Sequence, residues 1–180
     1  MTELAATSPV GANRLLFNPS LAGGSSLDAS PHIRGALLGL DLGHSQADVV
    51  RAAFEGIALN LRVILDELRQ LGRIGPEMVV VGGASQSRLW RQIFADALEI
   101  NIVKTNIGQE AGSLGAAAVA AVAAGLWPDF TRIDDVHRIE SVSHPEPAGV
   151  GVYRRLLPVF QQARAELGRI GDTLAASPSG

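Results

Sequence analysis

Val79-Val80-Val81-Gly82-Gly83-Ala84-Ser85-Gln86-Ser87 is the most informative segment of this sequence. Its β-branched run predicts a buried strand, and the two glycines that follow predict a sharp turn. An amphipathic segment then begins at Leu89 and predicts a helix. Strand, glycine turn and helix N-terminus are the parts from which many nucleotide sites are built. The stretch therefore indicates an α/β domain with a candidate nucleotide site, and a tight turn without ligand is the alternative.

Capping and periodicity signals place further helices and strands around this stretch. Ser45, with Asp48 three residues later, is close to a capping box, and Gly72 suits the C-cap of the same helix. Apolar residues recur between these caps at spacings of three and four: Val50, Phe54, Ile57, Leu61, Ile64 and Leu68. The same reasoning predicts strands over 15–17, 36–42, 78–81 and 100–104, and helices over 45–72, 86–98, 110–124 and 149–172. This alternation predicts the α/β class with a partly parallel sheet.

Three parts of the chain show no clear periodicity of apolar residues. Residues 1–12 and 173–180 are small, polar and aperiodic, so we expect flexible ends around a domain over 13–172. Residues 128–147 contain prolines and several charges and predict irregular structure. Pro158 falls inside the last predicted helix and should kink that helix or mark its true beginning.

The composition excludes several classes of protein. The 180 residues are 47% hydrophobic and 18% charged, which is typical of a globular domain, and the net charge of −3 disfavours nucleic acid as a partner. The chain has no cysteine, so disulfides and thiolate metal sites are excluded. No signal peptide is visible after Met1, and the most apolar stretch is too short to span a bilayer. We therefore expect a soluble, cytoplasmic protein.

Other residues that could carry chemistry have simpler explanations. Gly112 and Gly115, in the alanine-rich helix, favour close packing of that helix on the sheet, with approach to a nucleotide as the alternative. The four histidines show no metal-ligand spacing: His32, His44, His137 and His144. We interpret His44 as structural, Trp90 as a core residue and Asp134-Asp135 as a solvated pair. Asp28, in a Gly/Ser-rich loop, is a candidate for substrate contact.

Taken in order, these segments resemble the C-terminal half of the FGGY carbohydrate kinases, most closely the xylulokinase-like members. The resemblance covers about residues 14–170 and no single motif carries it. Its parts are Leu16-Phe17-Asn18-Pro19-Ser20-Leu21-Ala22-Gly23, Gly35-Ala36-Leu37-Leu38-Gly39-Leu40 with Asp48-Val49-Val50-Arg51-Ala52-Ala53-Phe54-Glu55-Gly56, then Val81-Gly82-Gly83-Ala84-Ser85-Gln86-Ser87 with Leu89-Trp90-Arg91-Gln92-Ile93, and the alanine-rich helix from Glu110 to Gly125.

The resemblance implies an actin-like, ribonuclease-H-type ATPase lobe that is incomplete in this chain. It further implies that ATP, with Mg²⁺, gives its γ-phosphate to a sugar hydroxyl that an aspartate deprotonates. Carried over residue by residue, Gly82, Gly83 and Ala84 lie against the adenine, and Ser85, Gln86 and Ser87 edge the same pocket. We identify neither a catalytic residue nor a magnesium ligand in this chain.

The family's catalytic aspartate, most of its sugar pocket and its phosphate hairpin belong to regions that this sequence does not match. Gly24-Ser25-Ser26 also stands where the family has Glu-Arg and then Pro. We therefore expect the ATP-binding part of a carbohydrate kinase, acting on a xylulose-like pentulose only with an N-terminal lobe and inactive alone. The alternative is a non-catalytic remnant or interaction module with weak or no nucleotide binding. Exposed apolar surface and an unpaired strand edge should make the lone chain self-associate.

Overall fold

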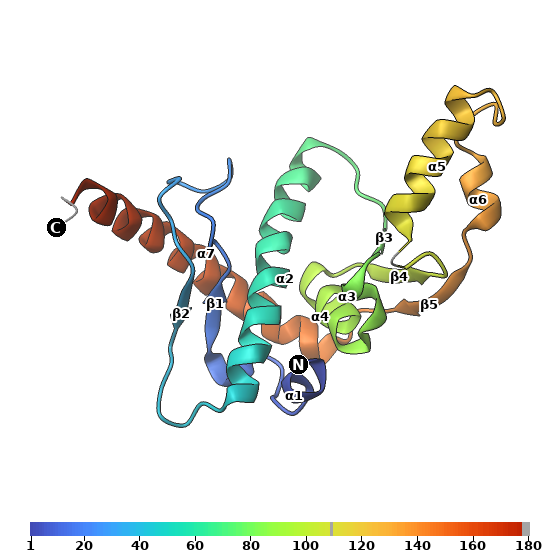
Figure 1. Ribbon diagram of the computed structural model, residues 1–180. Helices are drawn as coiled ribbons and strands as arrows, with labels where there is room; N and C mark the ends of the chain where they lie inside the picture. The colour runs from blue at the N-terminus through green and yellow to red at the C-terminus, as the bar shows by residue number, and fades with distance from the viewer. Residues whose placement is uncertain (109, 178–180) are drawn as a thin grey trace.

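The computed structural model describes residues 1–108 and 110–177 as a mixed α/β domain (Figure 1). Its strands are β1 (Leu16–Asn18), β2 (Ala36–Leu38), β3 (Glu77–Val79), β4 (Asn101–Thr105) and β5 (Ile139–Ser143). Its helices are α1 (Thr2–Ala6), the 3₁₀ turn η1 (Ala12–Arg14), α2 (Gln46–Leu71), α3 (Gly83–Gln86), α4 (Arg88–Leu98), α5 (Ala111–Ala123), α6 (Arg132–Val136) and α7 (Pro147–Ala176). None of these helices has the length and apolar character that crossing a bilayer requires.

The strands form two small sheets. β1 and β2 make an antiparallel pair in which Phe17 lies opposite Leu37. In the second sheet β4 lies in the middle, parallel to β3 and antiparallel to β5, with Met78 opposite Ile102 and Val103 opposite Val142. This mixed sheet confirms the predicted α/β class with a partly parallel sheet.

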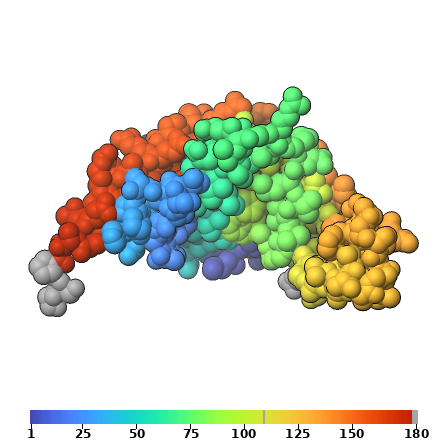
Figure 2. Space-filling view, turned by 90° about the horizontal axis from the view of Figure 1, so that it is seen from above, coloured from blue at the N-terminus to red at the C-terminus, as the bar shows by residue number. Residues whose placement is uncertain are grey.

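The core lies where α2, α4 and α7 meet. Buried residues of these helices and of the neighbouring strands form one cluster, which includes Leu59, Ile93, Leu98, Ile102, Tyr153 and Phe160. The pair α5–α6 lies at one end of the molecule and the last turns of α7 at the other, in both views (Figures 1 and 2). On α5 only Ala118 is buried among the described residues, so this helix contributes little to the core.

Local signals predicted several elements well. The capping box of α2 is present, with Ser45 accepting from the Asp48 amide and the Asp48 side chain accepting from the Ser45 amide, and Gly72 ends the helix. The strand predicted over 100–104 is β4, and the alanine-rich helix is α5, which ends just before Gly125 with its positive φ of 71°. α7 runs unbroken through Pro158, so that proline does not mark its beginning.

Other expectations differ from the structure. Residues 1–12 include the helix α1, Ala5 is fully buried, and Ser8 Oγ donates a 2.6 Å bond to Asp48. The segment over 128–147, expected to be irregular, contains α6 and β5. The strand expected over 36–42 ends at Leu38, because Gly39 turns with a φ of +82°. α7 continues to Ala176 into the tail expected over 173–180, of which residues 178–180 lie outside the described residues.

The strand that opens the key stretch is not buried as predicted. Val79 is 54% exposed and Val81 is 47% exposed. The reason is that β3 is an edge strand, with β4 as its one neighbour among the described residues. An edge strand of this kind leaves a row of backbone groups without a partner strand.

Candidate functional site

The glycine turn lies at the carboxyl end of β3 and leads directly into α3. Gly82 has φ +74° and ψ −160°, a backbone conformation that residues other than glycine rarely adopt. Its amide donates to the carbonyl of Gly108, in the segment that follows β4, at 3.1 Å. The turn is therefore bound to the carboxyl end of the neighbouring parallel strand, the edge of an open α/β sheet at which ligands bind.

The glycines of the turn and of α5 have open space beside them. Among the described residues, a Cβ atom added to Gly82, Gly83, Gly112 or Gly115 would meet no heavy atom within 4 Å. The close helix-on-sheet packing expected for Gly112 and Gly115 is therefore wrong, because nothing in the described residues packs against them. The absence of Cβ atoms at Gly82 and Gly83 leaves room for a flat ligand to approach the backbone of the turn.

The two serines of the turn hold its backbone in place. Ser85 is completely buried, and its Oγ donates to the Gly82 carbonyl at 2.7 Å. Ser87 separates α3 from α4 and caps α4 by accepting from the Trp90 amide at 3.2 Å. The helix expected over 86–98 is α4, which begins two residues later than expected, and the short helix α3 before Ser87 was not expected.

Ala84 and Gln86 take different places in the same turn. Ala84 is half-buried and packs against the core cluster. Gln86 is exposed, and its Nε2 lies 3.4 Å from Ser85 Oγ and close to Gly108, where an added Cβ would meet it at 2.6 Å. Of the six predicted site residues, Gly82, Gly83 and Gln86 have surface available to a ligand, whereas Ser85 is covered by the turn itself.

Arg91 lies beneath the turn and is absent from the predicted site residues. It is 9% exposed, and its Nη1 donates to the carbonyl of Ser85. Its Nε is buried without a hydrogen-bond partner in the described residues. Its spacing of three and four residues from Phe94 and Ala95, both on the apolar face of α4, is the signal that places it inside.

The remaining candidates have structural roles. Asp28 accepts from Arg164 Nε at 3.1 Å, and the two side chains, 5% and 8% exposed, join the Gly/Ser-rich loop to α7. Trp90 stacks on Phe54 with ring centroids 4.3 Å apart, which confirms it as a core residue. His44 Nδ1 accepts from the Asp41 amide at 3.0 Å, in agreement with a structural role.

Asp48 and Glu55, two acids on α2 in the segment that resembles the FGGY kinases, also stabilise the fold. Glu55 Oε1 accepts from Arg51, Tyr153 and the Gly11 amide at 2.7 to 3.0 Å. Asp48 accepts from Ser8 and Asn13, and the hydrogen bond from Ser8 is the largest cause that holds the pKa of the Asp48 carboxyl below its usual range. These contacts attach the first fourteen residues and α7 to α2.

The turn leaves its backbone open at Gly82 and Gly83, and no metal ligands are identified beside it. Within residues 1–108 and 110–177, no three His, Asp or Glu side chains gather in a way that could hold a metal ion. The acids Asp134 and Asp135 lie on α6 and are exposed. We therefore assign no magnesium ligand among these residues.

Comparison with known proteins gives consistent matches. Residues 1–124 match the model of the C-terminal domain of the FGGY family of carbohydrate kinases. The chain is 31% identical to a xylulose kinase of Staphylococcus epidermidis over 160 residues, which are 88% of this chain. It is also 31% identical to a gluconokinase of Bacillus licheniformis over 162 residues, which are 89% of this chain.

The solved structures agree with the sequence matches. The crystal structure of a xylulose kinase from Rhodospirillum rubrum superimposes with a TM-score of 0.81 and 29% identity over 95% of this chain. The matched part is 32% of the S. epidermidis protein and 34% of the R. rubrum chain. The chain thus spans about a third of the length of the relatives it matches.

Proposed function

Since the chain belongs to the FGGY family of carbohydrate kinases, we propose that it is the nucleotide-binding part of a sugar kinase. In this proposal it binds ATP and, together with an N-terminal lobe, transfers the γ-phosphate to a sugar hydroxyl. The observation that carries the proposal is the convergence of two glycine-containing segments at one sheet edge, where Gly82 bonds to Gly108 and the neighbouring glycines are open.

The adenosine is proposed to lie across the turn of residues 82–87, against the main chain of Gly82 and Gly83. A flat base needs close approach to the backbone, and the absence of Cβ atoms at these positions permits it. Gln86, exposed beside the turn, can donate and accept hydrogen bonds at the edge of the base or ribose. Ser85 then acts by holding Gly82 rather than by touching the nucleotide, because it is fully buried.

The proposed reaction joins the sugar hydroxyl oxygen to the γ-phosphorus as the bond to the β–γ bridging oxygen breaks and ADP leaves. An aspartate of the N-terminal lobe takes the hydroxyl proton, as the family resemblance implies. Mg²⁺, when bound with ATP, offsets the negative charge of the phosphates. Such a reaction depends on positioning and electrostatics, so the part described here supplies nucleotide binding alone.

We propose a xylulose-like pentulose as the sugar substrate. We propose the cytoplasm as the location of the protein. Support comes from the xylulose kinases of S. epidermidis and R. rubrum among the similar proteins. The gluconokinase at the same identity makes gluconate the next sugar to test. The loop that contains Gly24-Ser25-Ser26 is held against α7 by the ion pair between Asp28 and Arg164. We therefore propose no residue of this loop as a determinant of sugar specificity.

The binding proposal is tested by calorimetric titration of the 180-residue chain with ATP. Gly83→Val places a side chain in the open space of the turn, at a residue whose φ is not positive, and should abolish the binding heat. Gly75→Val is the matched control, because Gly75 is equally open but precedes β3 at its other end. Equal heats for Gly83→Val and the unmodified chain would refute this site, and no heat from any form would favour an interaction module without ligand.

The catalytic proposal needs a second experiment. The 180-residue chain alone should not phosphorylate xylulose, and activity should appear when the unmatched part of a xylulose kinase relative is supplied as a separate polypeptide. Phosphorylation by the chain alone would contradict the assignment of the base to another lobe. Nucleotide binding without activity in the mixture would favour a non-catalytic remnant.

A further inference from the structure

The side chain of Arg91 carries the least explained polar atom near the turn. Its Nε is buried and has no hydrogen-bond partner among the described residues. A buried donor without an acceptor destabilises a fold. Stability therefore does not explain why an arginine lies here, whereas departures of this kind are expected where function requires them.

The contacts of Arg91 lead directly to the turn. Its Nη1 donates to the carbonyl of Ser85, and Ser85 Oγ donates to the carbonyl of Gly82 at 2.7 Å. The Gly82 amide in turn donates to the Gly108 carbonyl at 3.1 Å. One continuous series of hydrogen bonds thus runs from α4 through both ends of α3 to the segment after β4.

The direction of these bonds determines which groups the turn presents. Carbonyls along a helix point toward its carboxyl end and amides toward its amino end. With the Ser85 carbonyl held by Arg91, the amino end of α3 and the two glycines are left on the open side, where an added Cβ meets no atom of the described residues within 4 Å. A four-residue helix cannot maintain this orientation by its own hydrogen bonds.

We infer that Arg91 is a positioning residue, which holds the 82–87 turn in the form that receives the adenosine. This inference rests on the proposed function. It assigns Arg91 no contact with the nucleotide, so its effect should be the same for ligands with and without phosphates. An arginine that acted through its charge would instead favour ATP over adenosine.

The test compares three variants of the full chain by titration with ATP and with adenosine. Arg91→Met keeps the aliphatic part of the side chain but removes the hydrogen-bond donors. It should lower the affinity for both ligands by about tenfold, the equivalent of about 1.4 kcal/mol. Arg91→Lys keeps one donor and the charge and should restore part of the affinity for both. Arg69→Met is the matched control, since Arg69 donates to the Leu98 carbonyl at 3.0 Å near the other end of α4. It should leave both affinities within about twofold, a change below 0.5 kcal/mol.

Hydrogen exchange in the ligand-free variants provides a readout that does not depend on binding. Arg91→Met should speed amide exchange in residues 82–87 while β4 keeps its protection, and Arg69→Met should not change exchange in the turn. If the unmodified chain bound neither ligand, the proposed function would fail, and exchange would still decide whether Arg91 fixes the turn.

Three results would overturn the inference. One is unchanged affinity and unchanged exchange in Arg91→Met. Another is weakened ATP binding with normal adenosine binding, which would indicate attraction of the phosphates. The third is an equal loss of affinity in Arg69→Met, which would indicate general destabilisation. If Arg91→Met did not fold, the same comparisons would be made with Arg91→Lys, for which unchanged turn exchange and unchanged affinities overturn the inference.

Discussion

The hydroxyl of Tyr153 donates to Oε1 of Glu55 at 3.0 Å, and both residues are 2% exposed. The same oxygen accepts from Arg51 Nε at 2.7 Å and from the Gly11 amide at 3.0 Å. One carboxylate thus binds α7 and the segment before η1 to α2. The matched family signature on α2 includes Glu55, and its role in this structure is to hold three parts of the chain together.

Glu55→Ala should be among the most destabilising single changes in the protein. It leaves the buried Arg51 without its counter-charge, a loss that costs about 3 to 5 kcal/mol. Tyr153→Phe removes one hydrogen bond and keeps the ring, so it should cost about 1 kcal/mol. Urea denaturation of the two variants measures both values. Equal losses would show that the carboxylate does not organise this cluster.

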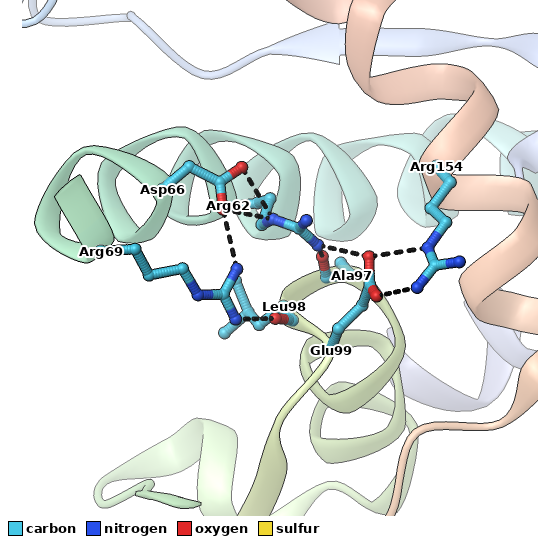
Figure 3. Close-up of polar contacts among 7 residues, drawn as sticks. All are labelled: Arg62, Asp66, Arg69, Ala97, Leu98, Glu99 and Arg154. Carbon is cyan, nitrogen blue, oxygen red and sulfur yellow. Dashed lines mark hydrogen bonds and ion pairs between the residues drawn. The ribbon is translucent and has the colours of Figure 1, made fainter. Parts of the chain in front are cut away.

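Glu99 should make stability depend on pH in the acid range. Arg154 and Arg62 donate to its carboxylate, as Figure 3 shows, and the hydrogen bond from Arg154 is the largest cause that lowers the pKa of Glu99 to about 2. Because the folded pKa lies below the unfolded value of about 4.3, the stabilisation is complete from about pH 5 upward. It is lost as the pH falls from about 5 toward 2.

Measurement of the free energy of unfolding against pH tests this effect. Glu99→Gln should show a shallower fall between pH 5 and 2 than the unmodified chain. Glu166→Gln is the matched control, because Glu166 pairs with Arg169 on the exposed surface of α7, where such pairs contribute little. If the unmodified chain and Glu99→Gln fell with the same slope, the Glu99 contacts would not contribute.

The open edge of β3 should cause the lone chain to self-associate. The Val80 amide donates to Val103 and the Pro76 carbonyl accepts from Asn101, so alternate residues of the strand face β4. Glu77, Val79 and Val81 therefore direct their backbone groups to the unpaired side, where a second copy can add a strand. Sedimentation velocity should show larger species as concentration rises.

Val79→Lys should reduce this association, since lysine on an edge strand opposes pairing. Val119→Lys adds the same charge at a residue of α5 that is 58% exposed and far from the strand edge in sequence, and should have less effect. A monodisperse monomer of the unmodified chain at all concentrations would contradict the prediction.

Elements with strong local signals could be predicted from the sequence alone. The capping box at Ser45, the glycine turn at Gly82 and the alanine-rich helix each depend on residues close in sequence. β5 could not be predicted, because Ile139–Ser143 has no clear apolar alternation and pairs with β4 as an antiparallel edge strand. The spacing of Arg91 on α4 indicates burial, but its hydrogen bond to the Ser85 carbonyl depends on the folded turn and could not be predicted from that spacing.

The spacing of apolar residues also does not predict which faces of the long helices α2 and α7 are buried. On α2 the apolar stripe is partly exposed, with Ile57 at 37% and Leu68 at 46%, while the face that carries Ala52, Glu55 and Leu59 is inside. On α7 the predicted face of Val152, Leu156, Phe160, Ala163, Leu167 and Ile170 contributes only Phe160 as a fully buried residue. Small residues and paired polar residues occupy the contacts instead, and their burial follows from partners distant in sequence.

Two glycines on α7, three residues apart, should respond to alanine in opposite directions. A Cβ on Gly171 would lie 2.1 Å from the carbonyl oxygen of His32, so Gly171→Ala must displace that loop or the helix. Overpacking of this kind costs about 1 to 3 kcal/mol. A Cβ on Gly168 would meet Ser30 Cβ at 3.5 Å, an ordinary contact, so Gly168→Ala should stabilise the helix by about 0.4 to 1 kcal/mol. Thermal unfolding should therefore show a lower Tm for the first variant and a higher Tm for the second. Equal shifts would mean that the loop at His32 does not pack on α7 as closely as the structure has it.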